Sequence, residues 1–282
     1  MRSHLDGTAA RTGERELGEI IVDKSSIGGI VLAVGGILAG LLLEGGNLRQ
    51  VLQPTAAMIV FGGTIGAVML QFPLPVVLNA VRRLGSVFVP SASKPELAIH
   101  RLVQYAQKAR REGIVSLDAE LNDIEDPFLK KSLMLAVDGT EPDELRKIME
   151  LELDNQAEYE EQVPQVFESA GGFAPTIGII GAVLGLIQVM QHLDKIDEVG
   201  RGIAVAFVAT IYGVGSANLL YLPIAGKMKL RIREEQITRE MTLEGVASIL
   251  EGMNPRMLET KLLGFLVDAE KTSKEPPEET SV

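Results

Sequence analysis

Hydrophobic residues along this chain are gathered into four long stretches, with polar residues between them. The stretches run from Ile27 to Leu43, Pro54 to Phe72, Phe173 to Gln191 and Ile203 to Gly226, and none of them contains Asp, Glu, Lys or Arg. A hydrocarbon core about 30 Å thick is crossed by about 20 apolar residues of helix, and about 17 suffice. The pattern therefore predicts four transmembrane helices.

The polar block between the second and third stretches reads as a series of helices. Pro95 to Glu112 places apolar residues at helical spacing on one face. Asp126 before Pro127 has the form of an N-cap, and Gly139 stops the helix that follows. These signals predict a helical domain over residues 73–172.

A second predicted helix begins in this block and continues into the third apolar stretch. Thr140 is expected to cap a helix beginning at Glu141 and Pro142, and the apolar pattern then continues towards Phe173. Pro164 lies inside this pattern, where a missing N–H and the proline ring kink or break a helix.

The chain beyond the fourth stretch is also expected to be helical. Residues 227–251 continue the fourth helix, and Asn254 with Pro255 begins a last amphipathic helix. No segment shows the alternation of a half-buried strand. The fold class is therefore all-α: a polytopic membrane protein with four transmembrane helices and a helical cytoplasmic domain. The expected units are a polar leader 1–24, helices one and two in 25–72, the domain 73–172, helices three and four in 173–226, C-terminal helices in 227–270 and a disordered tail 271–282.

Lysine and arginine set the expected orientation. The block 73–172 and the segment opening at Lys227 are rich in basic residues, whereas the connectors between paired stretches offer only Arg49, Lys195 and Arg201. Basic residues near span ends stay in the cytoplasm. Both termini and the central block are therefore predicted to be cytoplasmic. The leader has no basic n-region and does not resemble a cleaved signal peptide; Val22 is an alternative start.

Composition narrows the chemistry. The formal net charge of −11 disfavours a nucleic-acid partner, because phosphate binding needs a basic surface. Cysteine is absent and the three histidines are far apart, so we expect no metal and no cofactor. The sequence contains no phosphate-binding loop, metal-binding helix pair or nucleophile elbow, which argues against an enzyme.

The four stretches lack the ionisable groups that usually carry protons or ions at membrane depth. If the protein works on an ion gradient, another chain must supply the titrating group. A self-sufficient channel or transporter, which would need buried charge or discontinuous helices, stays open as an alternative.

Small residues line the apolar stretches. Gly178, Gly181 and Gly185 recur on one face of the third, which permits close helix packing in lipid either within one subunit or against a partner helix. The first stretch repeats the pattern with Gly36 and Gly40, and the second with Gly62 and Gly66.

Three further features each have an ordinary structural explanation and a functional one. Pro175 and Pro223 lie near the cytoplasmic ends of the third and fourth stretches, as ordinary membrane prolines or as hinges. The Thr210 hydroxyl lies mid-span, bonded to a preceding carbonyl or lining a wet pathway. Arg110, Arg111 and Asp118 flank Gly113, as solvated surface or as a docking site.

Several segments together resemble the flagellar motor stator A subunit, the MotA/PomA family. They are Phe61-Gly-Gly-Thr-Ile-Gly66, Lys108 to Asp118, Val137 to Asp143, the glycine-rich third stretch and Gly252-Met-Asn-Pro-Arg256. The order of two spans, a cytoplasmic block and two more spans agrees with this family over nearly the whole chain after residue 24. The related TolQ and ExbB energisers have one span before the block, and remain the alternative.

The resemblance implies partners and residue roles. It implies a ring of five A subunits in the bacterial inner membrane around two single-span, peptidoglycan-binding B subunits of the MotB type, each carrying the ion-binding aspartate. Arg110, Asp118 and, with less agreement across the family, Arg111 match positions that contact a rotor C-ring protein of the FliG type. Pro175 and Pro223 match prolines tied to conformational coupling, and Thr210 matches a pathway threonine.

Ion choice follows from two further positions of the resemblance. Sodium-type relatives have a threonine where this chain has Ala182 and an acid where it has Gln53, so it resembles the proton type at both. A methyl group and an amide are poorer replacements for the water around sodium. The sequence therefore predicts proton coupling through a pathway that includes Thr210 and Ala182.

Overall fold

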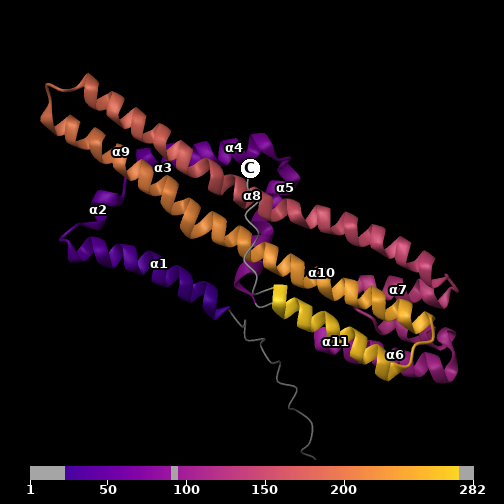
Figure 1. The fold of residues 1–282 in the computed structure, drawn as a ribbon. Coiled ribbons are helices and arrows are strands. Elements are labelled where there is room, and N and C mark those ends of the chain that lie inside the picture. The colour runs from indigo at the N-terminus through magenta and orange to yellow at the C-terminus, as the bar shows by residue number, and fades with distance from the viewer. Residues whose placement is uncertain (1–22, 90–94, 273–282) are drawn as a thin grey trace, which may run out of the picture.

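The computed structural model describes residues 23–89 and 95–272, and the regular structure in these two ranges is entirely helical (Figure 1). The elements on the N-terminal side are α1 Lys24–Leu43, α2 Leu48–Val51, α3 Pro54–Ala57, η1 Met58–Gly62, α4 Gly63–Gln71, α5 Leu74–Arg83 and η2 Leu84–Phe88. The remaining elements are α6 Pro95–Glu112, η3 Ile114–Asp123, α7 Pro127–Val137, α8 Pro142–Gln191, α9 Ile196–Ser216, η4 Ala217–Tyr221, α10 Leu222–Leu250 and α11 Pro255–Thr272. The all-α prediction is confirmed.

Two very long helices form the axis of the molecule. α8 has 50 residues, and α9, η4 and α10 form one uninterrupted rod from Ile196 to Leu250. The two rods lie side by side and antiparallel (Figure 1). At about 1.5 Å per residue the rods are roughly 75 and 80 Å long, more than twice the hydrocarbon thickness. The third and fourth apolar stretches are therefore parts of helices that continue well outside the membrane.

The prolines inside α8 do not interrupt it. Pro164, where the sequence predicts a kink or break, is buried inside a helix that continues through it, and Pro175 lies within the same helix. A break at Pro164 is therefore wrong. The start of α8 also differs by one residue, because Glu141 rather than Thr140 is the N-cap and its side chain makes no capping hydrogen bond.

Glycines bring the two rods into backbone contact. A Cβ added at Gly185 would lie 2.9 Å from both Ala206 N and Gly202 O, and one at Gly213 would lie 2.5 Å from Ala174 O. Side chains at these positions would force the helices apart. Packing within the subunit, one of the two explanations for the small residues of the third stretch, is thus what this structure shows for Gly178, Gly181 and Gly185.

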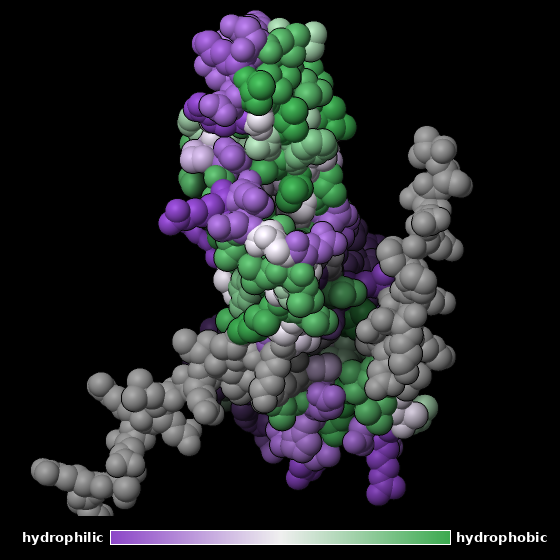
Figure 2. Space-filling model, turned by 90° about the vertical axis from the view of Figure 1, so that its left-hand side faces the viewer, coloured by the Kyte–Doolittle hydropathy of each residue, from purple (hydrophilic) through white to green (hydrophobic). Residues whose placement is uncertain are grey.

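The first two spans are held differently. α3, η1 and α4 pack against α8 and α9, with Ala56, Val60 and Thr64 buried. In α1, by contrast, the apolar window from Ser25 to Leu43 is 0% buried within the chain. α1 stands apart from the long rods (Figure 1), and apolar side chains cover much of the membrane-spanning end of the molecule (Figure 2).

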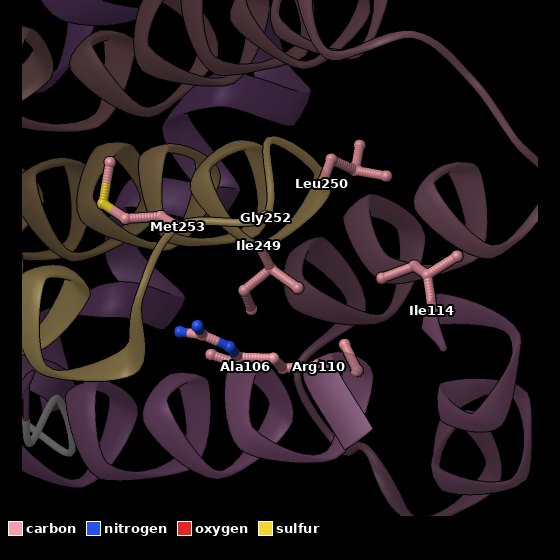
Figure 3. Close-up of a pocket in the computed structure, with 8 residues that line it drawn as sticks. Ala106, Arg110, Ile114, Ile249, Leu250, Gly252 and Met253 are labelled. Atoms are coloured by element: carbon pink, nitrogen blue, oxygen red, sulfur yellow. The ribbon is translucent and has the colours of Figure 1, made fainter. Parts of the chain in front are cut away.

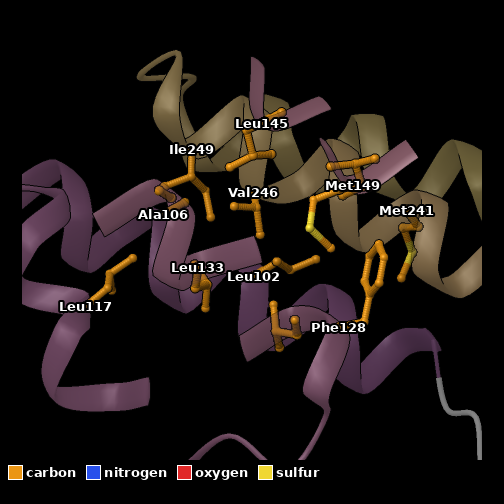
Figure 4. Close-up of a cluster of buried hydrophobic side chains, with 14 of the residues drawn as sticks. Leu102, Ala106, Leu117, Phe128, Leu133, Leu145, Met149, Met241, Val246 and Ile249 are labelled. Carbon is orange, nitrogen blue, oxygen red and sulfur yellow. The ribbon is translucent and has the colours of Figure 1, made fainter. Parts of the chain in front are cut away.

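A separate helical head surrounds the far ends of the rods. α6, η3, α7 and α11 pack around α8 and α10 through a common apolar core (Figure 4), which includes Leu102, Leu133, Met149, Val246 and Leu258. Asp126 caps α7 by accepting from Phe128 N at 2.9 Å, as predicted. Gly139 follows α7 at φ 84°, which glycine adopts without strain.

The last helix begins where the sequence predicts but ends two residues later than expected. α11 begins at Pro255 as predicted, and it extends to Thr272, so the first two residues of the expected tail 271–282 are helical. The rest of that tail and leader residues 1–22 lie outside the described residues. A shorter helix that the sequence did not indicate, α5, packs against α8 through Ala80.

The contact between the rods predicts a clear contrast between two glycines of α9. Gly213→Ala places a methyl group against the α8 backbone, whereas Gly215 has no atom within 4 Å of an added Cβ. We expect Gly213→Ala to lower the stability of the purified complex by about 1 to 3 kcal/mol, seen as a lower melting temperature. Gly215→Ala is the matched control and should melt at or above the wild-type temperature. Equal melting of both variants would contradict the packing.

Candidate functional sites

The predicted pathway residues lie on the paired face of α8 and α9. Thr210 Cα is 3.5 Å from the position of a Cβ on Gly178, and Ala182 is one helical turn further along α8. Both side chains are half-buried. The Thr210 hydroxyl donates to Ala206 O at 3.3 Å, so the back-bond is the interaction observed. The structure brings these two residues to neighbouring turns of one helix pair.

A tyrosine fixes the start of the second span. The Tyr212 hydroxyl donates to Val51 O at 2.6 Å and accepts from Gln53 N at 3.2 Å. Its ring stacks on Phe61 with centroids 5.8 Å apart. Backbone groups between α2 and α3 would otherwise lack helical partners, which is costly at membrane depth. Tyr212 therefore positions Gln53. The only signal of this contact in the sequence is a weak one, a tyrosine hydroxyl close to Thr210.

The two candidate hinge prolines, Pro175 in α8 and Pro223 in α10, lie at similar levels along the paired helices. An added Cβ on Gly171, one turn before Pro175, would meet the side chain of Leu222, the neighbour of Pro223. Pro223 follows the π-helical turn η4, Ala217 to Tyr221. A π turn commonly accommodates the lost hydrogen bond and the ring of a proline in a continuing helix. The hinge role of Pro175 and Pro223 stays a prediction.

A polar cluster ties the N-terminal end of α1 to the rest of the chain. Lys227 donates to Asp23 and to Ser26, Asp23 N donates to Phe88 O at 2.9 Å, and Arg231 donates to Val87 O at 3.3 Å. Hydrogen bonds from Lys227 and Ser25 hold the pKa of the Asp23 carboxyl well below its usual range. This anchor joins residues about 200 positions apart, which a single sequence does not reveal.

The predicted contact residues of the head are all exposed. Arg110 and Arg111 lie in the last turn of α6, and Asp118 lies in η3 beyond Gly113, whose φ is 85°. Arg111 donates to Gln107 O at 3.3 Å. In the described part of the chain no ion pair engages any of the three charges.

A neighbouring ion pair joins the two elements that carry these charges. Lys108 pairs with Glu120, which links α6 to η3 and raises the pKa of Lys108 through their hydrogen bond. The pair fixes the relative position of α6 and η3 while Arg110, Arg111 and Asp118 remain available to a partner.

Comparisons with known proteins agree with this arrangement. Residues 120–241 match the MotA/TolQ/ExbB proton channel family, and residues 27–113 match the N-terminal region of motility protein A. Motility protein A of Bacillus subtilis is 38% identical over 250 residues, which cover 87% of this chain and 91% of the relative. This chain belongs to the MotA/TolQ/ExbB family, in its motility protein A branch.

Solved structures of the family extend the likeness to three dimensions. The structure of C. jejuni MotAB matches with a TM-score of 0.83 at 33% identity, covering 92% of this chain and 100% of that chain. The flagellar MotAB stator complex from Bacillus subtilis matches with a TM-score of 0.81 at 36% identity, covering 90% and 100%. The family is one of proton channels, which is not an enzyme class.

The Tyr212 contact gives a prediction about the outer connector of this MotA-type chain. Tyr212→Phe keeps the ring and removes the hydroxyl that holds Val51 and Gln53. Since one hydrogen bond contributes about 1 kcal/mol, amide exchange in residues 51–53 should become about fivefold faster, measured by mass spectrometry on the complex. Tyr221→Phe is the control, because no hydrogen bond of its hydroxyl is found among the described residues. Unchanged exchange in Tyr212→Phe would refute the positioning role.

Proposed function

We propose that this protein is the A subunit of a flagellar motor stator, which couples ion flow across the inner membrane to torque on the rotor. The observation that carries this proposal is the match of at least 90% of the chain to MotAB structures, one of them named a flagellar stator complex. A TolQ/ExbB-type energiser is not favoured, because residues 27–113, which contain two spans before the head, match the motility protein A N-terminal region.

The partner is a MotB-type single-span subunit that carries the ion-binding aspartate. Support comes from the charge-free spans and from the structural relatives, which are MotAB complexes. The small-residue faces with Gly36 and Gly40 in α1, and Gly62 and Gly66 around η1 and α4, have no atom within 4 Å of an added Cβ. They leave room for neighbouring helices from other subunits.

The assembly is a ring of A subunits, five as in the family, with both termini cytoplasmic. One chain leaves α1 uncovered and exposes large apolar residues over the other spans, which lipid and neighbouring subunits can cover. The orientation rests on the basic residues at the cytoplasmic ends of the spans. Thr210 and Ala182 line the pathway towards the partner helix.

The energy available is sufficient for a mechanical switch. One elementary charge crossing 100 mV releases about 2.3 kcal/mol, which biases two packing states by roughly fiftyfold. Protonation of the partner's aspartate lets the A ring step around the fixed B helices. Pro175 and Pro223, which lie inside the rods where the membrane-spanning parts are expected to end, couple this step to the head. Arg110, Arg111 and Asp118 transmit it to a FliG-type rotor protein.

The coupling ion is the proton, and motility tests both the function and the ion. Deletion of the gene should abolish swimming while flagella remain assembled. In the wild type, swimming should persist without sodium and stop with a protonophore, because Ala182 and Gln53 offer no carboxylate or hydroxyl to replace sodium's water. Normal swimming in the deletion strain would contradict the stator function. Swimming that depends on sodium and resists the protonophore would contradict only the ion choice.

The rotor contact is tested by charge reversal. Arg110→Glu should markedly slow swimming, because an exposed cation of the head then repels the surface that it previously attracted. A compensating charge reversal on the rotor protein should restore part of the speed. Arg256→Glu in α11, another exposed arginine of the head, is the control for net charge and should swim nearly normally. Unchanged torque in Arg110→Glu would remove this residue from the contact.

A further inference from the structure

A cavity of about 230 Å³ opens beside Arg110 at the outer end of the head (Figure 3). α6, the start of η3, the end of α10 and the turn before α11 enclose it. Apart from Arg110 and Gly252, the residues that line it are apolar: Ala106, Ala109, Ile114, Ile249, Leu250 and Met253. This cavity is a separate feature from the pathway in the membrane.

The walls of the cavity are preformed. Gly252 has φ 73°, and the turn around it is closed by Gly252 N to Ile249 O and Met253 N to Ser248 O, each 3.0 Å. Ala106 and Ile249 belong to the buried core of the head. The space exists because α6 presents the small side chains of Ala106 and Ala109 there, so filling it costs little rearrangement.

The size of the cavity fits a side chain. Apolar cavities of about 150 Å³ accommodate a benzene molecule, whereas pockets for drug-sized molecules begin at about 300 Å³. A volume of about 230 Å³ therefore suits one leucine, methionine or phenylalanine side chain.

The charge at the rim of the cavity indicates which residue of the partner should accompany the inserted apolar side chain. Arg110 lines the cavity, its side chain is exposed, and no carboxylate pairs with it among the described residues. Glu251, next in sequence to the wall residue Leu250, is held by Arg146 at 2.7 Å. The rim thus offers an unpaired cation to a partner. A buried apolar anchor beside an arginine is a common form of interface hot spot.

We propose that this cavity receives a large apolar side chain of the rotor protein, from a helix that also presents a carboxylate to Arg110 one turn away. Side chains three or four residues apart lie on one face of a helix and can reach both features. The position suits this role, since α10 runs 24 residues, roughly 36 Å, from Gly226 at the membrane to the cavity wall at Leu250. The inference rests on the proposed stator function and adds an apolar anchor to its charge contacts.

Single cysteines test occupancy directly, because the chain contains no cysteine. Ala109→Cys places a thiol in the cavity wall, and Gln107→Cys places one on the exposed face of the same helix. With a membrane-permeant maleimide, we expect Ala109→Cys to react about tenfold more slowly in cells with assembled rotors than in cells lacking the rotor, as for a buried hot spot. Gln107→Cys should react equally in both. Equal reaction of Ala109→Cys in both strains, or protection in both, would overturn the proposal; the second result would assign the cavity to another copy of this chain.

A variant that fills the cavity tests the apolar anchor separately from the charge contact with the rotor protein. Ala109→Leu occupies the space while leaving Arg110 intact, and Gln107→Leu adds the same apolar volume outside it. Torque should fall at least fivefold in Ala109→Leu and stay normal in Gln107→Leu, with proton conduction by the complex unchanged in both. If torque is normal in Ala109→Leu but reduced in Arg110→Glu, the apolar anchor is wrong and the charge contact stands. Normal torque in both would overturn the two together.

Discussion

Backbone contact between α8 and α9 at glycines is the interaction on which the rest of the structure depends. Lipid tails are as apolar as the side chains, so helices in a membrane are held by close packing rather than by a hydrophobic force. Gly178, Gly185, Gly202 and Gly213 permit this packing because another side chain at any of them would meet opposing atoms at about 3 Å or less. Both helices continue into the head without a break. The membrane pair and the head are therefore built on the same two continuous helices, which is the structural basis of the coupling proposed for Pro175 and Pro223.

The first and second spans have surfaces that a single chain does not cover. α1 is anchored at its N-terminal end through Asp23 and Lys227, yet its apolar window is 0% buried, and the glycines of α1 together with Gly62 and Gly66 of the second span face open space. The hydroxyls of Thr64, Thr210 and Ser216 each bond to a carbonyl of their own helix. The chain thus supplies packing surfaces and satisfied polar groups, and under the proposed function the titrating group comes from a companion subunit.

The sequence predicted the features that depend on local pattern. Four charge-free stretches gave the spans, Asp126 and Gly139 gave the ends of α7, and Pro255 gave the start of α11, because each signal lies within a few residues of the structure it determines. Features that depend on contacts between distant segments were missed. They include the Lys227 contact with Asp23, the Tyr212 hydroxyl on Val51 and the cavity beside Arg110. The break expected at Pro164 was wrong, because Pro164 is buried within α8 and the helix continues through it despite the missing N–H.

Proton flux into sealed vesicles is the most direct test of whether the titrating group lies on a companion subunit and not on this chain. The purified chain should be reconstituted alone and together with its MotB-type partner, under the same membrane potential. The account predicts flux only when the partner and its aspartate are present. Flux at the full rate through the chain alone would contradict it.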